Sequence, residues 1–205
     1  MSGESNQEIE SKFYVQSLDR IQQQLEDRQA ELVQPRVLES NLRFDRPDGS
    51  LRASRQVLRL RQDTETRLTY KGPSALSSGV LSRREIEFTV ESFERAQALL
   101  EALEFEPHFL YEKYRSIFEV QDCLVMLDEL PYGNFVEIEG QTVADVQRVA
   151  AELQLNPKVA VLASYHALFE QLRQARQFPF HDLTFANFTG LTCSPAELGV
   201  SPADT

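Results

Sequence analysis

Residues 8–15 alternate between charged and apolar side chains in a way that is typical of a β-strand. Glu8, Glu10 and Lys12 take every second position, and Ile9 and the apolar residues up to position 15 take the others. Residues two apart on a strand share one face, which places the two carboxylates about 7 Å apart. This spacing lets the pair share a divalent cation or hold two neighbouring ones, although a solvated strand face shows the same pattern.

Similar alternation, together with turn residues, predicts seven further strands, at 36–46, 56–61, 67–71, 82–90, 109–120, 123–130 and 133–139. Helical spacing of apolar residues predicts helices at 17–34, 92–103, 142–154 and about 160–176. Ser17 is expected to cap the first helix and Pro35 to end it. Residues 73–80 are expected to form a loop of small residues.

One domain, residues 1–176, accounts for all of these elements. Residues 177–205 form an irregular C-terminal tail that is rich in Pro, Gly, Thr and Phe. The phenylalanines of the tail suggest packing against the domain, and the stretch from Ser194 is expected to be loose.

The composition is that of a soluble globular protein, with 41% hydrophobic and 26% charged residues in 205. A net charge of −11 argues against nucleic-acid binding. No apolar run is long enough to span a membrane, and the first seven residues lack a signal-peptide pattern. Cys123 and Cys193 match no metal or redox spacing, so free thiols in the cytoplasm are expected. Monomer and homodimer both remain open.

Eight strands joined mostly as hairpins favour an α+β fold built on an antiparallel sheet, and closure into a barrel removes its edges. The amphipathic helices must cover the apolar sheet face, which leaves the charged face inside as the lumen of a tunnel. Burying so many charges is costly unless they neutralise one another or bind a charged ligand. The charged face therefore indicates a binding site.

Acids and bases separate by strand. Glu8 and Glu10 on the first strand and Glu137 and Glu139 on the last form two Glu-x-Glu pairs, whose oxygens suit Mg²⁺ or Mn²⁺. The middle strands carry the cations. A linear triphosphate with its metal ions fits this division, whereas a single phosphate leaves most of the cations unused.

Seven ordered motifs resemble the CYTH family, which comprises class IV adenylyl cyclases and thiamine triphosphatases within the triphosphate tunnel metalloenzymes. The motifs are Glu8-Ile9-Glu10-Ser11-Lys12, Leu58-Arg59-Leu60-Arg61, Thr69-Tyr70-Lys71-Gly72-Pro73, Arg84-Glu85-Ile86-Glu87, Lys113-Tyr114-Arg115, Leu127-Asp128-Glu129 and Phe135-Val136-Glu137-Ile138-Glu139. The resemblance runs from about residue 7 to residue 176 and implies an eight-stranded antiparallel tunnel.

The resemblance also implies residue roles. Metal binding falls to Glu8, Glu10, Asp128, Glu137 and Glu139, and triphosphate binding to Lys12, Arg59, Arg61, Lys71, Lys113 and Arg115. Glu8, Glu10, Lys12, Glu137 and Glu139 form the expected catalytic set. Strand parity adds Arg83, Glu85 and Glu87 to the lumen and places Arg84 outside.

Three functions compete. The first is metal-dependent hydrolysis of a triphosphate, with inorganic triphosphate as the preferred substrate. The second is class IV adenylyl cyclase, which converts ATP to cyclic AMP and pyrophosphate; thiamine triphosphatase is a further enzymatic alternative. The third is non-catalytic polyphosphate binding, which does not require both glutamate pairs. The three histidines are scattered, so structural roles are expected for them, and Tyr165 is expected to serve in packing.

Overall fold

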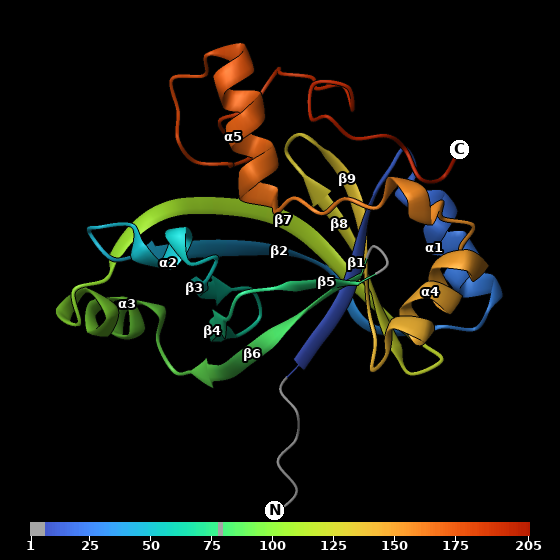
Figure 1. Ribbon diagram of the computed structural model, residues 1–205, viewed down its shortest axis with the longest axis horizontal. Helices are drawn as coiled ribbons and strands as arrows, with labels where there is room; N and C mark the ends of the chain where they lie inside the picture. The colour runs from blue at the N-terminus through green and yellow to red at the C-terminus, as the bar shows by residue number, and fades with distance from the viewer. Residues whose placement is uncertain (1–6, 78–79) are drawn as a thin grey trace, which may run out of the picture.

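The strands form a single antiparallel sheet in a computed structural model, which describes residues 7–77 and 80–205 (Figure 1). The strands are β1 Gln7–Val15, β2 Glu31–Asp45, β3 Val57–Gln62, β4 Thr66–Lys71, β5 Ala75–Ser77, β6 Val80–Val90, β7 Glu106–Val120, β8 Cys123–Leu130 and β9 Gly133–Glu139. The helices are α1 Leu18–Asp27, α2 Ser50–Ala53, α3 Phe93–Ala102, α4 Val143–Glu152, the 3₁₀ turn η1 Pro157–Val159, and α5 Tyr165–Arg176. Residues 1–6, most of the segment expected to lack a signal peptide, lie outside the described part of the chain.

The sheet closes on itself through β1. Its strands follow the order β1-β9-β8-β7-β2-β3-β4-β6, and β6 pairs back onto β1. One half of β1 pairs with β6, from Gln7 to Glu10, and the other half pairs with β9, from Glu10 to Val15. The predicted α+β fold with a closed ring of eight antiparallel strands is therefore confirmed. The short strand β5 only adds to the start of β6.

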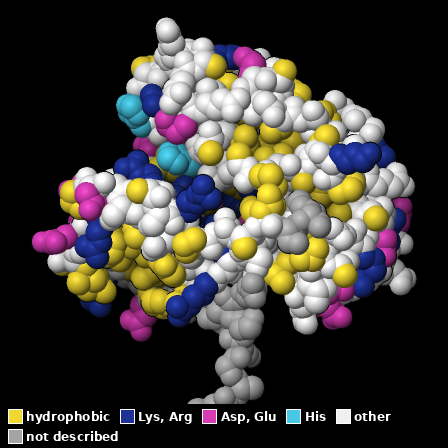
Figure 2. Space-filling model, viewed as in Figure 1, with side chains coloured by type: hydrophobic (Ala, Val, Ile, Leu, Met, Phe, Trp, Pro, Cys, Tyr) yellow, Lys and Arg dark blue, Asp and Glu magenta, His cyan; other side chains and the backbone are white. Residues whose placement is uncertain are grey.

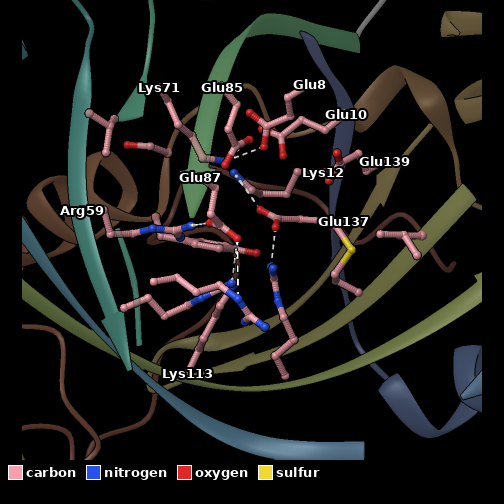
Figure 3. A pocket seen from close by; sticks show the side chains of 18 of the residues that line it. Glu8, Glu10, Lys12, Arg59, Lys71, Glu85, Glu87, Lys113, Glu137 and Glu139 are labelled. Atoms are coloured by element: carbon pink, nitrogen blue, oxygen red, sulfur yellow. Dashed lines mark hydrogen bonds and ion pairs between the residues drawn. The ribbon is translucent and has the colours of Figure 1, made fainter. Parts of the chain in front are cut away.

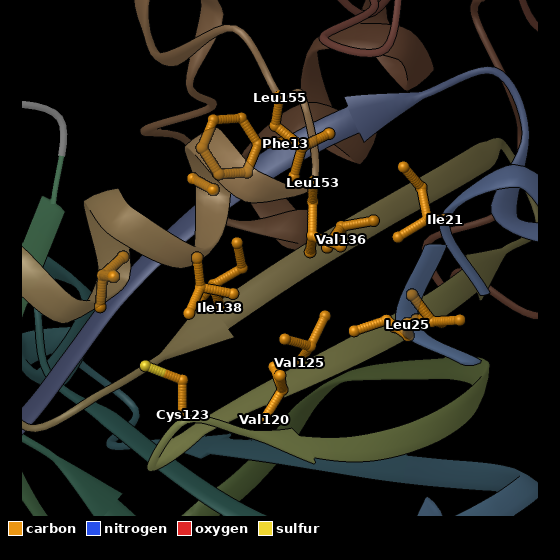
Figure 4. Packing of buried hydrophobic residues seen from close by; sticks show 14 of the residues in the cluster. Phe13, Ile21, Leu25, Val120, Cys123, Val125, Val136, Ile138, Leu153 and Leu155 are labelled. Carbon is orange, nitrogen blue, oxygen red and sulfur yellow. The ribbon is translucent and has the colours of Figure 1, made fainter. Parts of the chain in front are cut away.

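Helices α1 and α4 cover the outer face of β1, β7, β8 and β9 (Figure 4). Ile21 and Leu25 of α1 and Val146 of α4 are fully buried against Val136 and Ile138 of β9. Each such side chain contributes roughly 1.5–3 kcal/mol when it leaves water. This packing fixes the apolar side of β1 and β9 outward and turns their glutamates inward.

The remaining cover is uneven. Helix α3 packs Ala96 and Leu100 against Leu60 of β3, whereas Phe88 on the outer face of β6 stays 53% exposed. At one end of the ring α5 buries Phe169 and other side chains in an aromatic cluster with β7 and β9. The outside of the ring is thus covered only in part.

The prediction of a helix over 17–34 is wrong beyond residue 27. Ser17 does cap α1, by accepting a hydrogen bond from the Arg20 amide, but Gln29 takes a left-handed conformation (φ 59°). From residue 31 the chain pairs with β7, and the register shifts around Gln34 absorb Pro35. A proline lacks the amide hydrogen that a regular ladder needs and is tolerated at such a bulge. Pairing with a strand eighty residues away overrides the local helical pattern.

Two other expectations need correction. Residues 75–77 of the expected loop 73–80 form β5, while residues 78 and 79 lie outside the described part. The expected loose end from Ser194 is docked instead: Leu198 and Ala203 are 1% exposed, and the Asp204 carboxylate accepts hydrogen bonds from the Gln16 and Ser17 amides at 2.9–3.1 Å. The end packs because the Asp204 carboxylate accepts hydrogen bonds from the backbone amides between β1 and α1.

No helix in the described part is long and apolar enough to cross a membrane.

Candidate active site in the ring

The lumen of the ring contains a cavity of about 440 Å³. Every residue predicted for the site except Asp128 lines it, and Arg84 lies outside on the exposed face. The predicted lining residues are Glu8, Glu10, Lys12, Arg59, Arg61, Lys71, Arg83, Glu85, Glu87, Lys113, Arg115, Glu137 and Glu139. Strands far apart in sequence thus bring their charged faces together (Figure 3).

An acidic cluster occupies the wall where β1 meets β9. Glu10 lies directly opposite Glu139 in the strand register, and like charges in such positions repel. Burial, followed by the nearby Glu8 and Glu137, raises the pKa of Glu10. Burial and Glu8 raise the pKa of Glu139 to about 7. Negative charge at this wall is therefore only partly neutralised by the protein itself.

Glu8 differs from these two carboxylates because cations surround it. It pairs with Lys71 and accepts a hydrogen bond from Arg83 at 2.6 Å. Burial is the largest effect and opposes ionisation, but Lys71 and Arg83 together outweigh it and lower the pKa of Glu8 to about 2. Glu8 therefore links the acidic cluster to the basic wall.

The basic wall extends over β3, β4 and β7. Glu87 lies between Arg59 and Arg61, at 3.6 and 3.2 Å. Lys113 is 1% exposed and Arg115 is 8% exposed, and both lie in the lumen. Desolvated cations of this kind make strong, charge-assisted hydrogen bonds to anions.

Asp128 is not among the residues that line the cavity. It is fully buried beside the basic wall, where its carboxylate accepts hydrogen bonds from Lys113 at 3.0 Å, Arg115 at 2.6 Å and the Tyr165 hydroxyl at 2.8 Å. The structure therefore gives Asp128 the position of a counter-ion for the basic wall. Its predicted place among the metal ligands has no support from this geometry.

Sequence reasoning missed several polar residues in and beside the lumen. Glu39 is fully buried and lies 3.5 Å from both Arg61 and Lys113, and Arg43, Tyr111 and Tyr165 line the cavity. The alternation at positions 39, 41 and 43 of β2 was a usable signal, since it matches that of β1. Tyr165 gave no such signal, because it lies at the start of α5 and enters the lumen only in the folded chain.

Lys12 is held at the end of the ring that α5 covers. Its ammonium group lies 3.5 Å from Glu137, donates to the carbonyl oxygen of Ala163 at 3.2 Å, and sits 4.4 Å from the centre of the Tyr165 ring. A cation over an aromatic face is stabilised by the ring quadrupole. The segment before α5 thereby fixes the position of this cation.

The acidic wall suits a divalent cation. Carboxylate oxygens are the donors that Mg²⁺ and Mn²⁺ prefer, and a bound cation relieves the repulsion between Glu10 and Glu139. Among the described residues, however, no three acidic, His or Cys side chains already converge in the geometry of a metal site. The donor set fits the ion, and binding requires side chains such as Glu8 to rearrange.

A closed antiparallel ring with an acidic and a basic wall in its lumen defines the class of triphosphate tunnel proteins. The family model described as "CYTH domain" matches residues 6–163. The chain therefore belongs to the CYTH family, whose members are adenylyl cyclase-like or triphosphatase enzymes.

Relatives of known name agree with this assignment. "Putative adenylate cyclase MJ0240" of Methanocaldococcus jannaschii is 26% identical over 141 residues, which cover 68% of this chain and 79% of the relative. A solved structure named "putative adenylate cyclase" from Vibrio parahaemolyticus superposes with a TM-score of 0.71 and 24% identity, over 79% of this chain and 97% of that one.

The Hippeastrum protein HpAC1, also named a "putative adenylyl cyclase", gives a TM-score of 0.59 at 21% identity, over 80% of this chain and 95% of that one. Its structure is described as revealing a dominant triphosphatase activity. Identities below 25% establish the shared fold only.

Proposed function

We propose that this protein is a metal-dependent triphosphatase whose preferred substrate is inorganic triphosphate. The observation that carries the proposal is the division of one cavity into an acidic wall, around Glu10 and Glu139, and a basic wall, around Arg59, Arg61 and Arg115. A linear chain of phosphates presents charge along its whole length. It can therefore bind cations along the whole basic wall at once, whereas orthophosphate leaves most of them unused.

In this proposal the two walls have separate tasks. Arg59, Arg61, Lys113 and Arg115 bind the phosphate oxygens and stabilise the charge that develops on the transferred and leaving groups. Glu8, Glu10, Glu137 and Glu139 hold Mg²⁺ or Mn²⁺, which when bound neutralises phosphate charge and polarises phosphoryl oxygens. Lys12, fixed by Ala163 and Tyr165, orients the phosphate nearest the covered end.

Product analysis tests this function directly. Purified protein is incubated with inorganic triphosphate, ATP or thiamine triphosphate, each with Mg²⁺ and with Mn²⁺, and released phosphate and cyclic AMP are measured. We expect phosphate release to be fastest from inorganic triphosphate. Cyclic AMP as the main product would reject hydrolysis in favour of cyclisation.

The metal assignment has its own test. Glu10→Gln and Glu139→Gln keep the side-chain shape but remove the charges, so each should abolish turnover while the circular dichroism spectrum stays unchanged. Glu91→Gln, at an exposed position outside the ring, is the matched control and should retain activity. EDTA should stop turnover, and added Mg²⁺ or Mn²⁺ should restore it. Turnover that continues in EDTA would reject the metal assignment.

Adenylyl cyclase is the second candidate, because two of the relatives above carry that name. The lumen alone does not favour it, since the two walls recognise the phosphates rather than the group attached to them. The description of the Hippeastrum protein supports placing hydrolysis first. The product assay above separates the two reactions.

A further inference from the structure

Arg43 is a lumen cation that neither the sequence motifs nor the proposed function uses. It lies on β2, directly opposite Arg59 on β3, so the Cα atoms of the two arginines are about 5 Å apart. Both side chains line the cavity. Like charges in directly opposite positions destabilise a sheet, so this pair calls for a compensating anion.

The protein supplies no such anion for Arg43. Nine lysines and arginines line the cavity, and eight of them have a carboxylate oxygen within 3.6 Å. Among these nine described cations, Arg43 alone has no carboxylate in ion-pair range, and its buried Nε atom has no hydrogen-bond partner. The Nε atom of Arg59 is also buried without a partner. Two adjacent guanidinium groups thus carry hydrogen-bond donors that no protein group accepts.

The surroundings of Arg43 also favour an anion. Burial lowers the pKa of Arg43, Tyr111 raises it, and the nearby Arg59, Arg83 and Arg52 lower it further. Ser164 and His166, at the amino-terminal end of the twelve-residue helix α5, line the same part of the cavity, where the helix dipole is positive. In the space-filling view, Lys and Arg side chains gather in the hollow beneath α5, beside a His side chain (Figure 2).

We propose that Arg43, with Arg59, forms an additional phosphate subsite, so that the cavity binds linear polyphosphates of four or more phosphates more tightly than triphosphate. This inference rests on the proposed function, because it extends the same cavity by one anionic group. Arg43 continues the row formed by Arg59 and Arg61 onto the neighbouring strand. A triphosphate held by the other cations leaves Arg43 and part of Arg59 without a phosphate. A fourth phosphate bound beside these two arginines would contact both guanidinium groups.

Calorimetric titration in EDTA, where no turnover occurs, tests the subsite. The ligands are inorganic triphosphate, inorganic tetraphosphate and ATP, and the proteins are the wild type, Arg43→Gln and Arg43→Lys. Arg95→Gln, on an exposed face of α3, is the charge-matched control. One charge-assisted contact predicts that the wild type binds tetraphosphate about tenfold or more tightly than triphosphate.

Arg43→Gln should remove this preference while leaving triphosphate binding within about twofold of the wild type. Arg43→Lys should keep part of it, and Arg95→Gln all of it. The melting temperature of unliganded Arg43→Gln should equal or exceed that of the wild type, because an unpaired charge is removed, so a misfolded variant would be recognised.

Three results would overturn the subsite: equal affinity of the wild type for both chains, equal weakening of both chains by Arg43→Gln, or weakening confined to ATP. The first two leave triphosphate binding, and thus the proposed function, intact. The proposed function fails if triphosphate neither binds in this titration nor releases phosphate with Mg²⁺ or Mn²⁺ in the product assay. The subsite is judged separately, by whether tetraphosphate binding depends on Arg43.

Discussion

Replacing Asp128 by Asn should destabilise the protein even when no metal or substrate is present. The Asp128 carboxylate is completely buried and serves Lys113, Arg115 and the Tyr165 hydroxyl at once. Asparagine preserves the shape but removes the charge, which leaves two buried cations short of a counter-ion.

The magnitude follows from the partners that remain. Breaking a buried ion pair by removing one partner costs about 3–5 kcal/mol. Lys113 keeps Glu39 at 3.5 Å and Arg115 keeps Glu137 at 2.5 Å, so we expect the lower end, about 3 kcal/mol. For a chain of this length, about 2–4 °C is lost per kcal/mol, which predicts a melting temperature about 6–12 °C lower.

Urea and thermal unfolding in EDTA provide the measurement. Asp122→Asn, at an exposed turn position that tolerates asparagine, is the control and should change the free energy of unfolding by less than about 0.5 kcal/mol. If Asp128→Asn were as stable as the control in EDTA but had lost its stabilisation by Mg²⁺, the counter-ion role would be refuted. Asp128 would then be a metal ligand.

Three further predictions concern the lumen and its rim. Lys71→Ala and Arg115→Ala should each weaken triphosphate binding about 10- to 150-fold in calorimetry, whereas Arg36→Ala and Arg173→Ala, whose ion pairs lie outside the cavity, should change it little; equal effects from all four would mean that the walls are assigned wrongly. Triphosphate with Mg²⁺ should raise the melting temperature by several degrees, since a ligand at a hundredfold excess over Kd contributes about 2.7 kcal/mol, and orthophosphate should raise it far less; equal shifts would contradict recognition of a phosphate chain. Burial and nearby arginines lower the pKa of His108 and His166 to about 4, below the unfolded value of about 6.5. Between these values the folded state binds fewer protons than the unfolded state, so the stability that the two neutral histidines contribute is lost as pH falls from about 6.5 to 4. The double His→Gln variant should lose less free energy of unfolding in urea over that range, and an unchanged dependence of that free energy on pH would refute the assignment.

The sequence alone determined which residues face the lumen on most strands. On β1, β6 and β9 the charged side chains recur at every second position, and a strand has a period of two, so the apolar residues between them must face the opposite side. Strands β8 and β9 lie at the predicted residues because Gly133 and the turn before it separate two short alternating segments. Local chemistry and strand geometry suffice for these features.

Only the tertiary structure decided how these faces meet. The pairing of β1 with β6 closes the ring, and the pairing of residues 31–34 with β7 replaces the end of a predicted helix. The same long-range packing brings Tyr165 into the lumen, pairs Asp128 with Lys113 and Arg115, and leaves Arg43 without a carboxylate. Each of these outcomes depends on atoms that are distant in sequence. A periodic pattern shows which way a side chain points on its strand, but the charge that it meets there is set by the strand or helix that packs across from it.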